Sequence, residues 1–272
     1  MAKVAAIQMV SGGAIGPNLM QAEWLIAKAV DKGAKMVLLP ESFALMSRDR
    51  NDMLLITETI GKGRIQDFIA ECAQKFKVWI VAGTIPTTSP EDHRAYATSV
   101  VYDNTGTMVD YYHKIHLFDV ELPGGESHQE SLTYYPGKEI KVIDSPFGGI
   151  GLSVCYDLRF PELYRQLRNQ GADIIMVPSA FIEATGKVHW RTLLHARAIE
   201  NQCYIVAANQ GGVHDNRVTY GHSTIVGPWG LTLDLHEKGP GFVLAHIDKI
   251  RVDVLREEFP VWEHKRLWQS KH

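Results

Sequence analysis

The chain has 272 residues, of which 45% are hydrophobic and 22% charged, and its formal net charge is −3. This composition is typical of an enzyme-sized globular protein, so we expect a single domain over residues 1–272. The scattered charges disfavour nucleic acid as a partner, and no apolar run approaches the roughly 20 residues that a membrane-spanning helix needs. Three cysteines, an odd number, do not suggest a disulfide framework, so a cytoplasmic location is expected.

The first predicted element is a strand, because the first ten residues form an apolar run that is broken by Gln8 and is too short for a signal peptide. Residues 29–41 and 167–179 resemble each other. In each, a helical pattern ends at a glycine (Gly33 or Gly171) suited to a left-handed helix cap, a short apolar strand follows, and a proline closes it. Each is followed by a further helix and strand, expected at 65–76 and 78–83 and at 190–200 and 203–208. The alternation predicts an α/β protein, and the duplication suggests two packed sheets with helices outside.

The middle of the chain contains a hairpin, a long loop and a buried strand. A turn at residues 103–106 precedes the segment 109–118, which is typical of the second strand of a hairpin. Residues 122–137 form the longest irregular segment, and a loop of that length in a compact domain is usually functional or disordered. The apolar run 149–154 predicts a strand that stops at Cys155, where a polar, turn-like stretch begins.

Three residues near predicted strand ends are candidates for catalysis. Cys155 precedes a helix start, where backbone N–H groups stabilise a thiolate and an oxyanion, although an inert buried cysteine would also fit. Glu41 follows a buried strand on the same rim, where it can act as a base or cap a helix. Lys114 stands among aromatic residues and needs an acidic partner such as Glu41. Together they supply a nucleophile, its base and a cation for the charge that develops when an amide or nitrile is attacked.

The segments around these residues, 38–43, 113–119 and 151–162, resemble the glutamate, lysine and cysteine blocks of the nitrilase superfamily of carbon–nitrogen hydrolases. The resemblance covers nearly the whole chain. It implies a four-layer αββα sandwich with internal duplication, a small-molecule amide substrate, association into homodimers or larger homo-oligomers, and no metal or organic cofactor. It also implies that Glu130, in the long loop, helps to position the lysine and the substrate. One departure is Ala97, which follows Tyr96 where family members commonly carry asparagine.

Shorter blocks resemble the Nit branch of this superfamily, whose amidases act on 2-oxo acids that carry an amide at the far end of a five-carbon chain. The blocks are residues 178–181, 185–186, 189–190, 196–204 and 220–223. The resemblance implies a thioester on the cysteine, an oxyanion beside the backbone N–H of Tyr156, and a 2-oxo carboxylate held by Arg159 and Thr185. For Arg159 an ion pair with Asp157 or Glu162 is the alternative.

The choice of substrate within the branch depends on a few of these blocks. Residues 178–181 and 199–204 favour deaminated glutathione, whereas 116–119 is equally similar to the ω-amidases that act on α-ketoglutaramate. The two substrates share the 2-oxo end, but only deaminated glutathione carries Cys-Gly on its amide nitrogen. We therefore expect the loops at the rim of the site to discriminate between them, with His214 and Arg217 meeting the carboxylate of the peptide.

The sequence offers three alternative functions: a metal site, a protease-like cysteine–histidine pair and a non-catalytic binding protein. His113, His116 and Asp119 resemble a metal triad, but on a strand positions three apart face opposite sides. A protease-like pair of the cysteine with His189 or His222 is chemically reasonable, but the local cysteine signatures of such proteases are absent. A catalytically silent binding protein with the same fold is the third alternative, and the presence of all three candidate catalytic residues disfavours it.

Overall fold

The computed structural model describes residues 1–47, 49–122, 125, 127–215 and 217–266. The helices are α1 (Ile15–Asp31), α2 (Arg50–Leu55), α3 (Arg64–Phe76), α4 (Pro161–Asn169), α5 (Glu183–Thr185), α6 (Arg191–Asn201) and α7 (Lys249–Glu258). The strands of the first half are β1 (Ala2–Gln8), β2 (Ala34–Leu38), β3 (Trp79–Val81), β4 (Ile85–Thr88), β5 (Ala95–Tyr102), β6 (Met108–His113), β7 (Asp119–Glu121) and β8 (Ser127–Gln129). Those of the second half are β9 (Val142–Ile143), β10 (Gly149–Leu152), β11 (Ala172–Ser179), β12 (Tyr204–Asn209), β13 (Val213–His214), β14 (Arg217–Val218), β15 (Ser223–Val226), β16 (Thr232–His236) and β17 (Gly241–Ile247).

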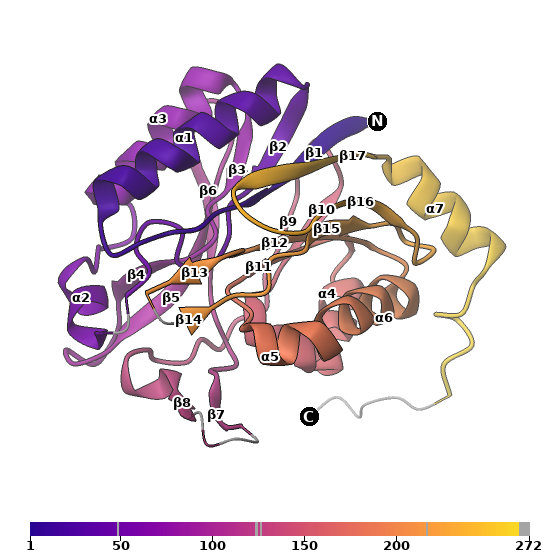
Figure 1. Ribbon diagram of the computed structural model, residues 1–272. Coiled ribbons are helices and arrows are strands. Elements are labelled where there is room, and N and C mark those ends of the chain that lie inside the picture. The colour runs from indigo at the N-terminus through magenta and orange to yellow at the C-terminus, as the bar shows by residue number, and fades with distance from the viewer. Residues whose placement is uncertain (48, 123–124, 126, 216, 267–272) are drawn as a thin grey trace.

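Within the described residues the strands form two large sheets that pack face to face. The first has the order β17-β1-β2-β3-β5-β4, with β6 paired to β5, and the second has the order β16-β15-β12-β11-β10-β9. Helices α1 and α3 cover the first sheet, and α4 and α6 cover the second (Figure 1). This arrangement confirms the predicted αββα sandwich.

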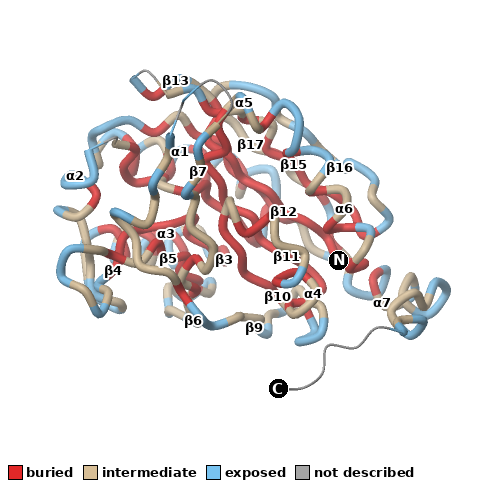
Figure 2. Tube along the Cα trace, turned by 90° about the horizontal axis from the view of Figure 1, so that it is seen from below, coloured by how far each residue is buried: buried red, intermediate tan, exposed pale blue. Residues whose placement is uncertain are grey.

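The alternation of side chains along β1 explains why the layers form. Ala5 and Ile7 pack into the cluster that includes α1 and α3, whereas Val4 and Ala6 belong to the cluster between the two sheets. Successive strand residues point to opposite faces, so a strand that is apolar at every position is buried on both. Figure 2 shows this burial concentrated along the central strands, while exposed residues lie on the outer faces of the helices and in the loops.

The predicted duplication is present in the structure. Helices α1 and α4 are each followed by a glycine with positive φ, 95° at Gly33 and 94° at Gly171, and then by the parallel strands β2 and β11. Two details differ from the prediction. The strand expected at 78–83 is shorter, because the chain turns at Gly83 (φ 45°), and Pro178 lies within β11 instead of closing it.

The carboxyl ends of the central strands meet at one edge of the sandwich, where the loops are more ordered than the sequence indicated. β2 and β3 run parallel to β1, and β10, β11 and β12 run parallel to one another. The loop expected at 122–137 contains β8, which pairs with β7, and a 3-10 turn at Glu130–Leu132; residues 123, 124 and 126 lie outside the described residues. In the described part of the chain, no helix combines the length and the apolarity that crossing a membrane requires.

Candidate active site

The predicted site residues line one cavity of about 420 Å³ at this edge. Glu41 lies just after β2, Lys114 follows the last residue of β6, and Cys155 opens the 3-10 turn that follows β10. The remaining predicted residues on its wall are Glu130, Tyr156, Arg159 and Thr185. Segments far apart in the sequence therefore converge on one site, as the strand-end argument predicts.

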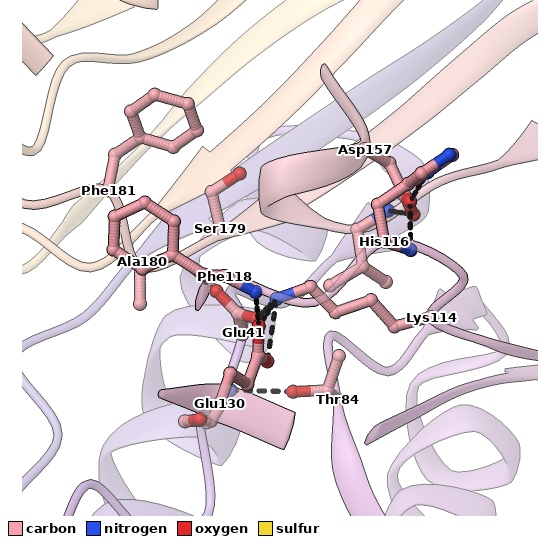
Figure 3. Close-up of polar contacts among 12 residues, drawn as sticks. Glu41, Thr84, Lys114, His116, Phe118, Glu130, Asp157, Ser179, Ala180 and Phe181 are labelled. Atoms are coloured by element: carbon pink, nitrogen blue, oxygen red, sulfur yellow. Dashed lines mark hydrogen bonds and ion pairs between the residues drawn. The ribbon is translucent and has the colours of Figure 1, made fainter. Parts of the chain in front are cut away.

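Lys114 forms a buried ion cluster with two carboxylates (Figure 3). Its Nζ lies 2.9 Å from Oε1 of Glu41 and 2.7 and 2.8 Å from Oε1 and Oε2 of Glu130. Only 1% of the lysine side chain is exposed. An ammonium this buried requires close anionic partners, so the cluster holds the charge of Lys114 at a fixed position.

Backbone contacts hold the acidic and basic side chains in place. The N–H of Ala180 donates to Oε2 of Glu41 at 2.8 Å, and the N–H of Phe118 donates to Oε2 of Glu130 at 2.6 Å. The backbone N–H of Lys114 donates to the carbonyl of Ala97 at 2.9 Å. Each carboxylate therefore has both a charged and a neutral donor, which restricts its orientation.

Two glycines allow the segments that carry these groups to approach closely. At Gly83, a Cβ would lie 1.9 Å from the carbonyl oxygen of Pro40, the residue before Glu41. At Gly137, whose N–H donates to the carbonyl of Lys114 at 2.8 Å, a Cβ would lie 2.1 Å from a neighbouring backbone oxygen. Any larger residue would displace the turns that carry the glutamate and the lysine.

The thiol is carried on a strained turn. Cys155 has φ 47°, in the left-handed region that non-glycine residues seldom adopt. The turn is closed by the N–H of Asp157, which donates to the carbonyl of Val154 at 3.0 Å. Among the cysteines, Cys72 and Cys203 are buried, whereas Cys155 is partly exposed and faces the cavity.

Burial dominates the electrostatics of the site. Burial and the nearby Glu41 carboxylate raise the pKa of the Cys155 thiol, against the opposing effect of Lys114, so the thiol needs a base before it can attack. Burial disfavours the Lys114 ammonium, but Glu130 and Glu41 hold its pKa well above the ordinary value. Burial also raises the pKa of Glu130, although Lys114 acts in the other direction. The site therefore keeps a permanent cation beside a protonated thiol.

Arginines also line the cavity, among them Arg159. Nη1 of Arg159 lies 3.1 Å from Nδ1 of His189, and its guanidinium lies over the rings of Tyr156 and Phe181, 5.6 and 5.2 Å from their centroids. Among the described residues, Arg159 pairs with neither alternative partner, Asp157 or Glu162, and the Asp157 carboxylate accepts hydrogen bonds from other groups. Arg159 is therefore free to present donors to a ligand.

Two arginines that differ in exposure also line the cavity, Arg50 and Arg217. Nη2 of Arg217 donates to the carbonyl of Ala180 at 3.3 Å, while its buried Nε has no partner among the described residues. His214, expected beside it, is not available to a substrate. It is buried, with Nδ1 2.6 Å from the carbonyl of Ser11 and Nε2 2.8 Å from Oγ1 of Thr219.

The structure gives the other histidines partners of their own. Nδ1 of His113 lies 2.8 Å from Oγ1 of Thr98, and Nδ1 of His116 lies 2.7 Å from Oδ1 of Asp157. His113 and His116 therefore do not converge with Asp119 on a common point. Neither His189 nor His222 is among the described residues that line the cavity, so neither is placed as the base of a protease-like pair.

Several cavity residues were not predicted from the sequence. They are Arg50, Met46, Met53, Phe118, Thr133 and Tyr134. Arg50 and Met53 lie on α2, Met46 lies before it, Phe118 precedes β7, and Thr133 and Tyr134 follow β8. Their places on the wall depend on tertiary packing, which the local sequence does not show. Ala97, the departure from the family pattern, also lines the cavity, and its carbonyl supports Lys114 as described above.

Comparisons with known proteins identify the family of the chain. Residues 3–257 match the family model described as carbon-nitrogen hydrolase. A Synechocystis sp. protein named deaminated glutathione amidase is 42% identical over 266 residues, which cover 96% of this chain and 97% of that protein. The human protein of the same name is 38% identical over 268 residues, 97% of this chain and 82% of that protein.

Solved structures show the same fold. The nitrilase superfamily protein Nit3 of Saccharomyces cerevisiae superposes with a TM-score of 0.88 at 30% identity, covering 98% of this chain and 97% of that one. The longer NitFhit protein of C. elegans gives a TM-score of 0.90 at 38% identity, covering 98% of this chain and 66% of that one. The chain therefore belongs to the carbon–nitrogen hydrolase family.

Proposed function

We propose that this protein is an amidase that hydrolyses deaminated glutathione through a thioester on Cys155. The observation that carries the proposal is the cavity that brings a partly exposed thiol together with the Glu41–Lys114–Glu130 cluster and with Arg159. The names of the relatives at 37–42% identity support the same substrate. The alternative is ω-amidase activity on α-ketoglutaramate, which presents the same 2-oxo end.

In the proposed acylation, Glu41 takes the proton of the thiol as the sulfur attacks the amide carbon. The carbonyl oxygen becomes an oxyanion, which the Lys114 ammonium and the backbone N–H of Tyr156 stabilise. Glu41 then returns its proton to the departing nitrogen, and the carbon–nitrogen bond breaks. The products of this half-reaction are the thioester and an amine, which is Cys-Gly for deaminated glutathione and ammonia for α-ketoglutaramate.

In the proposed deacylation, Glu41 takes a proton from water, which attacks the thioester carbon. A second oxyanion forms at the same place and collapses to a carboxylic acid, while the sulfur leaves and regains a proton. Glu130 keeps Lys114 in position through both half-reactions, because it contacts Nζ through both of its oxygens. Neither half-reaction in this scheme calls on a cofactor.

Substrate recognition is proposed to depend on the arginines. Arg159, with the hydroxyl of Thr185, holds the 2-oxo carboxylate, for which a planar guanidinium fork is well suited. Arg217, which also lines the cavity, binds the terminal carboxylate of the peptide through its guanidinium. The exposed guanidinium of Arg50, at the start of α2, adds a positive charge to the same rim.

The assay compares kcat/KM for deaminated glutathione, α-ketoglutaramate and simple nitriles. We expect deaminated glutathione to be the best substrate. Replacing Arg159 with lysine should weaken both 2-oxo substrates alike. Arg217→Gln should weaken only the peptide, by about 10- to 100-fold, since a hydrogen bond to a charged group contributes roughly 1.5–3 kcal/mol. Arg191→Gln, at an exposed position outside the cavity, is the matched control for the lost charge.

Other outcomes of this assay would change the proposal. A clear preference for α-ketoglutaramate would assign the protein to ω-amidase activity. Activity confined to nitriles, or to amides without a carboxylate, would overturn the 2-oxo amide proposal altogether. Equal loss of the peptide substrate in the Arg191 and Arg217 variants would show that general electrostatic attraction, and not a specific carboxylate contact, is responsible.

We further propose that residues 1–272 act as one domain and that copies of the chain associate. Apolar side chains that are half or more exposed gather beside the edge strand β16, namely Ile199, Trp229, Leu231 and Phe259. The rings of Trp229 and Phe259 meet edge to face at 5.5 Å. A second copy would shield such a patch, and sedimentation velocity tests this, since a monomer at assay concentration would contradict it. A cytoplasmic location stays a prediction.

A further inference from the structure

Asp157 links the two segments that carry the candidate nucleophile and the lysine, although it is outside the cavity. Its side chain is fully buried, and it is not among the described residues that line the cavity. Oδ2 accepts hydrogen bonds from the N–H of Val154 at 2.9 Å and from the hydroxyl of Tyr112 at 2.8 Å. Oδ1 accepts from the backbone N–H of His116 at 3.0 Å and lies 2.7 Å from its Nδ1. Four donor groups therefore surround one carboxylate.

The donors to Asp157 lie next to Lys114 and Cys155 in the sequence. Tyr112 and His116 lie two residues before and two residues after Lys114, so the carboxylate holds the segment on both sides of the lysine, through the Tyr112 hydroxyl on one side and the backbone N–H and ring of His116 on the other. Val154 is the residue immediately before the thiol. Figure 3 shows the side chains of Asp157 and His116 lying against each other at the end of the segment that carries Lys114. One buried group thus fixes the lysine segment relative to the thiol turn.

The thiol turn needs such a constraint. A left-handed conformation like that of Cys155 is unfavourable for a residue other than glycine and persists only where the surroundings enforce it. His116 adds a second contact to the same turn, because its ring stacks on Phe160 with the centroids 3.7 Å apart and the planes 7° from parallel. The carboxylate and the stacked ring together connect the two segments.

We propose that Asp157 is a positioning residue that sets the placement of the Cys155 thiol relative to the Lys114 ammonium, and thereby the rate of acylation. It acts through the backbone and not by contact with substrate. A displacement of about 1 Å can cost around 10²-fold in rate, so a small shift of the turn is sufficient. Binding of the substrate, which depends on the long arginine side chains that line the cavity, should change less than the rate.

Two substitutions separate geometry from charge. Asp157→Asn keeps the shape of the side chain but replaces one carboxylate oxygen with an NH2 group. Because every group around the carboxylate donates, this NH2 group would face donors where the aspartate oxygen accepted their hydrogen bonds. The Tyr112 hydroxyl keeps its proton in the variant, since burial is the main cause that raises its pKa well above the ordinary range. Asp157→Glu keeps the charge but adds a methylene, which shifts the carboxylate within a packed interior. If position is what matters, both variants lose activity.

The matched control is Asp173, a buried aspartate in β11 that is also outside the cavity. Its Oδ1 lies 2.7 Å from Nη1 of Arg256, and its Oδ2 accepts the N–H of Gly149 at 3.0 Å. Asp173→Asn should lower the melting temperature without a comparable loss of kcat. This comparison separates positioning from general destabilisation.

The experiment measures kcat, KM and melting temperature of each variant, with kcat corrected for the folded fraction. For Asp157→Asn and Asp157→Glu we expect kcat to fall about 10²-fold, with a much smaller change in KM. Tyr112→Phe, which removes one of the four donor groups, should lower kcat by a smaller factor. In the double variant Tyr112→Phe with Asp157→Asn, the losses of kcat should be non-additive. Any amide that the wild-type protein hydrolyses can be used as the substrate in this assay, so the test does not depend on deaminated glutathione being the natural substrate.

Three results would overturn the proposal. Wild-type kcat per folded molecule in Asp157→Asn would show that the carboxylate is merely structural. Full activity in Asp157→Glu would show that its charge matters and its position does not. An equal loss of kcat in Asp173→Asn at matched destabilisation would mean that any weakening of the fold has the same effect.

Discussion

Removing the buried cation gives a quantitative test of the ion cluster. In Lys114→Met, an apolar side chain of similar length would replace the ammonium and leave Glu41 and Glu130 facing each other without a counterion. Three N–O contacts of 2.7–2.9 Å are lost from a side chain that is 1% exposed. Breaking a buried pair in this way costs about 3–5 kcal/mol. At roughly 2 °C per kcal/mol for a chain of this size, the melting temperature should fall by about 6–10 °C.

The pH dependence of this loss identifies its cause. Burial already raises the pKa of Glu130, and loss of the cation removes the group that opposes this rise. A carboxylate whose pKa is higher in the folded than in the unfolded state favours folding at low pH, and that contribution is lost as the pH rises through the folded value. The difference in melting temperature between wild type and Lys114→Met should therefore become smaller as the pH is lowered.

Differential scanning calorimetry over a range of pH measures this gap. The matched variant is Lys114→Met combined with Glu130→Gln, which removes one carboxylate together with the cation. It should recover much of the lost stability while remaining inactive. If the free energy of unfolding of Lys114→Met lay within about 1 kcal/mol of the wild-type value, the reasoning would be refuted, because such a small loss is typical of exposed ion pairs. A double variant that is no more stable than the single one would refute it as well.

Three further predictions concern single residues. Iodoacetamide should label Cys155 first and abolish activity in step, because Cys155 is partly exposed in the cavity beside its proposed base Glu41, whereas Cys72 and Cys203 are buried; equal labelling of Cys72 would contradict this. Glu41→Gln should slow single-turnover acylation and deacylation by about 10²–10⁴-fold, and near-native rates would exclude its role as base. Burial lowers the pKa of His113 to about 4, so the unfolded chain binds a proton at a higher pH than the folded chain does, and the free energy of unfolding falls between pH 6.5 and about 4. In His113→Gln, urea titrations should show a smaller fall of the free energy of unfolding over this pH range, and a fall equal to that of wild type would contradict the prediction.

The layers of the fold could be predicted because local patterns determine them. Fully apolar strands between helices require both faces of each sheet to be covered, and Gly33 and Gly171 mark equivalent helix ends in the two halves. The positions of Glu41 and Cys155 followed from the same argument, since each comes soon after a buried strand. Sequence patterns are informative where one segment determines its own structure.

Contacts between distant segments could not be predicted in this way. His214 was expected at the rim of the cavity, but it is buried because Ser11, some 200 positions earlier, supplies its partner. Asp157 was expected as an alternative partner for Arg159, whereas all its donors except the nearby N–H of Val154 come from Tyr112 and His116, in the other half of the molecule. Nothing in the local sequence around Tyr134 indicates that it lines the cavity. These contacts exist only once the two sheets have packed.

The central claim is that Cys155 carries the acyl group. Rapid-quench intact-mass spectrometry of the protein mixed with deaminated glutathione tests it most directly, followed by peptide mapping of the adduct. We predict a single five-carbon 2-oxo acyl group on Cys155, which forms and decays fast enough to account for turnover and is absent from Cys155→Ala. An acyl group on another residue, or sustained turnover by Cys155→Ala, would contradict the account.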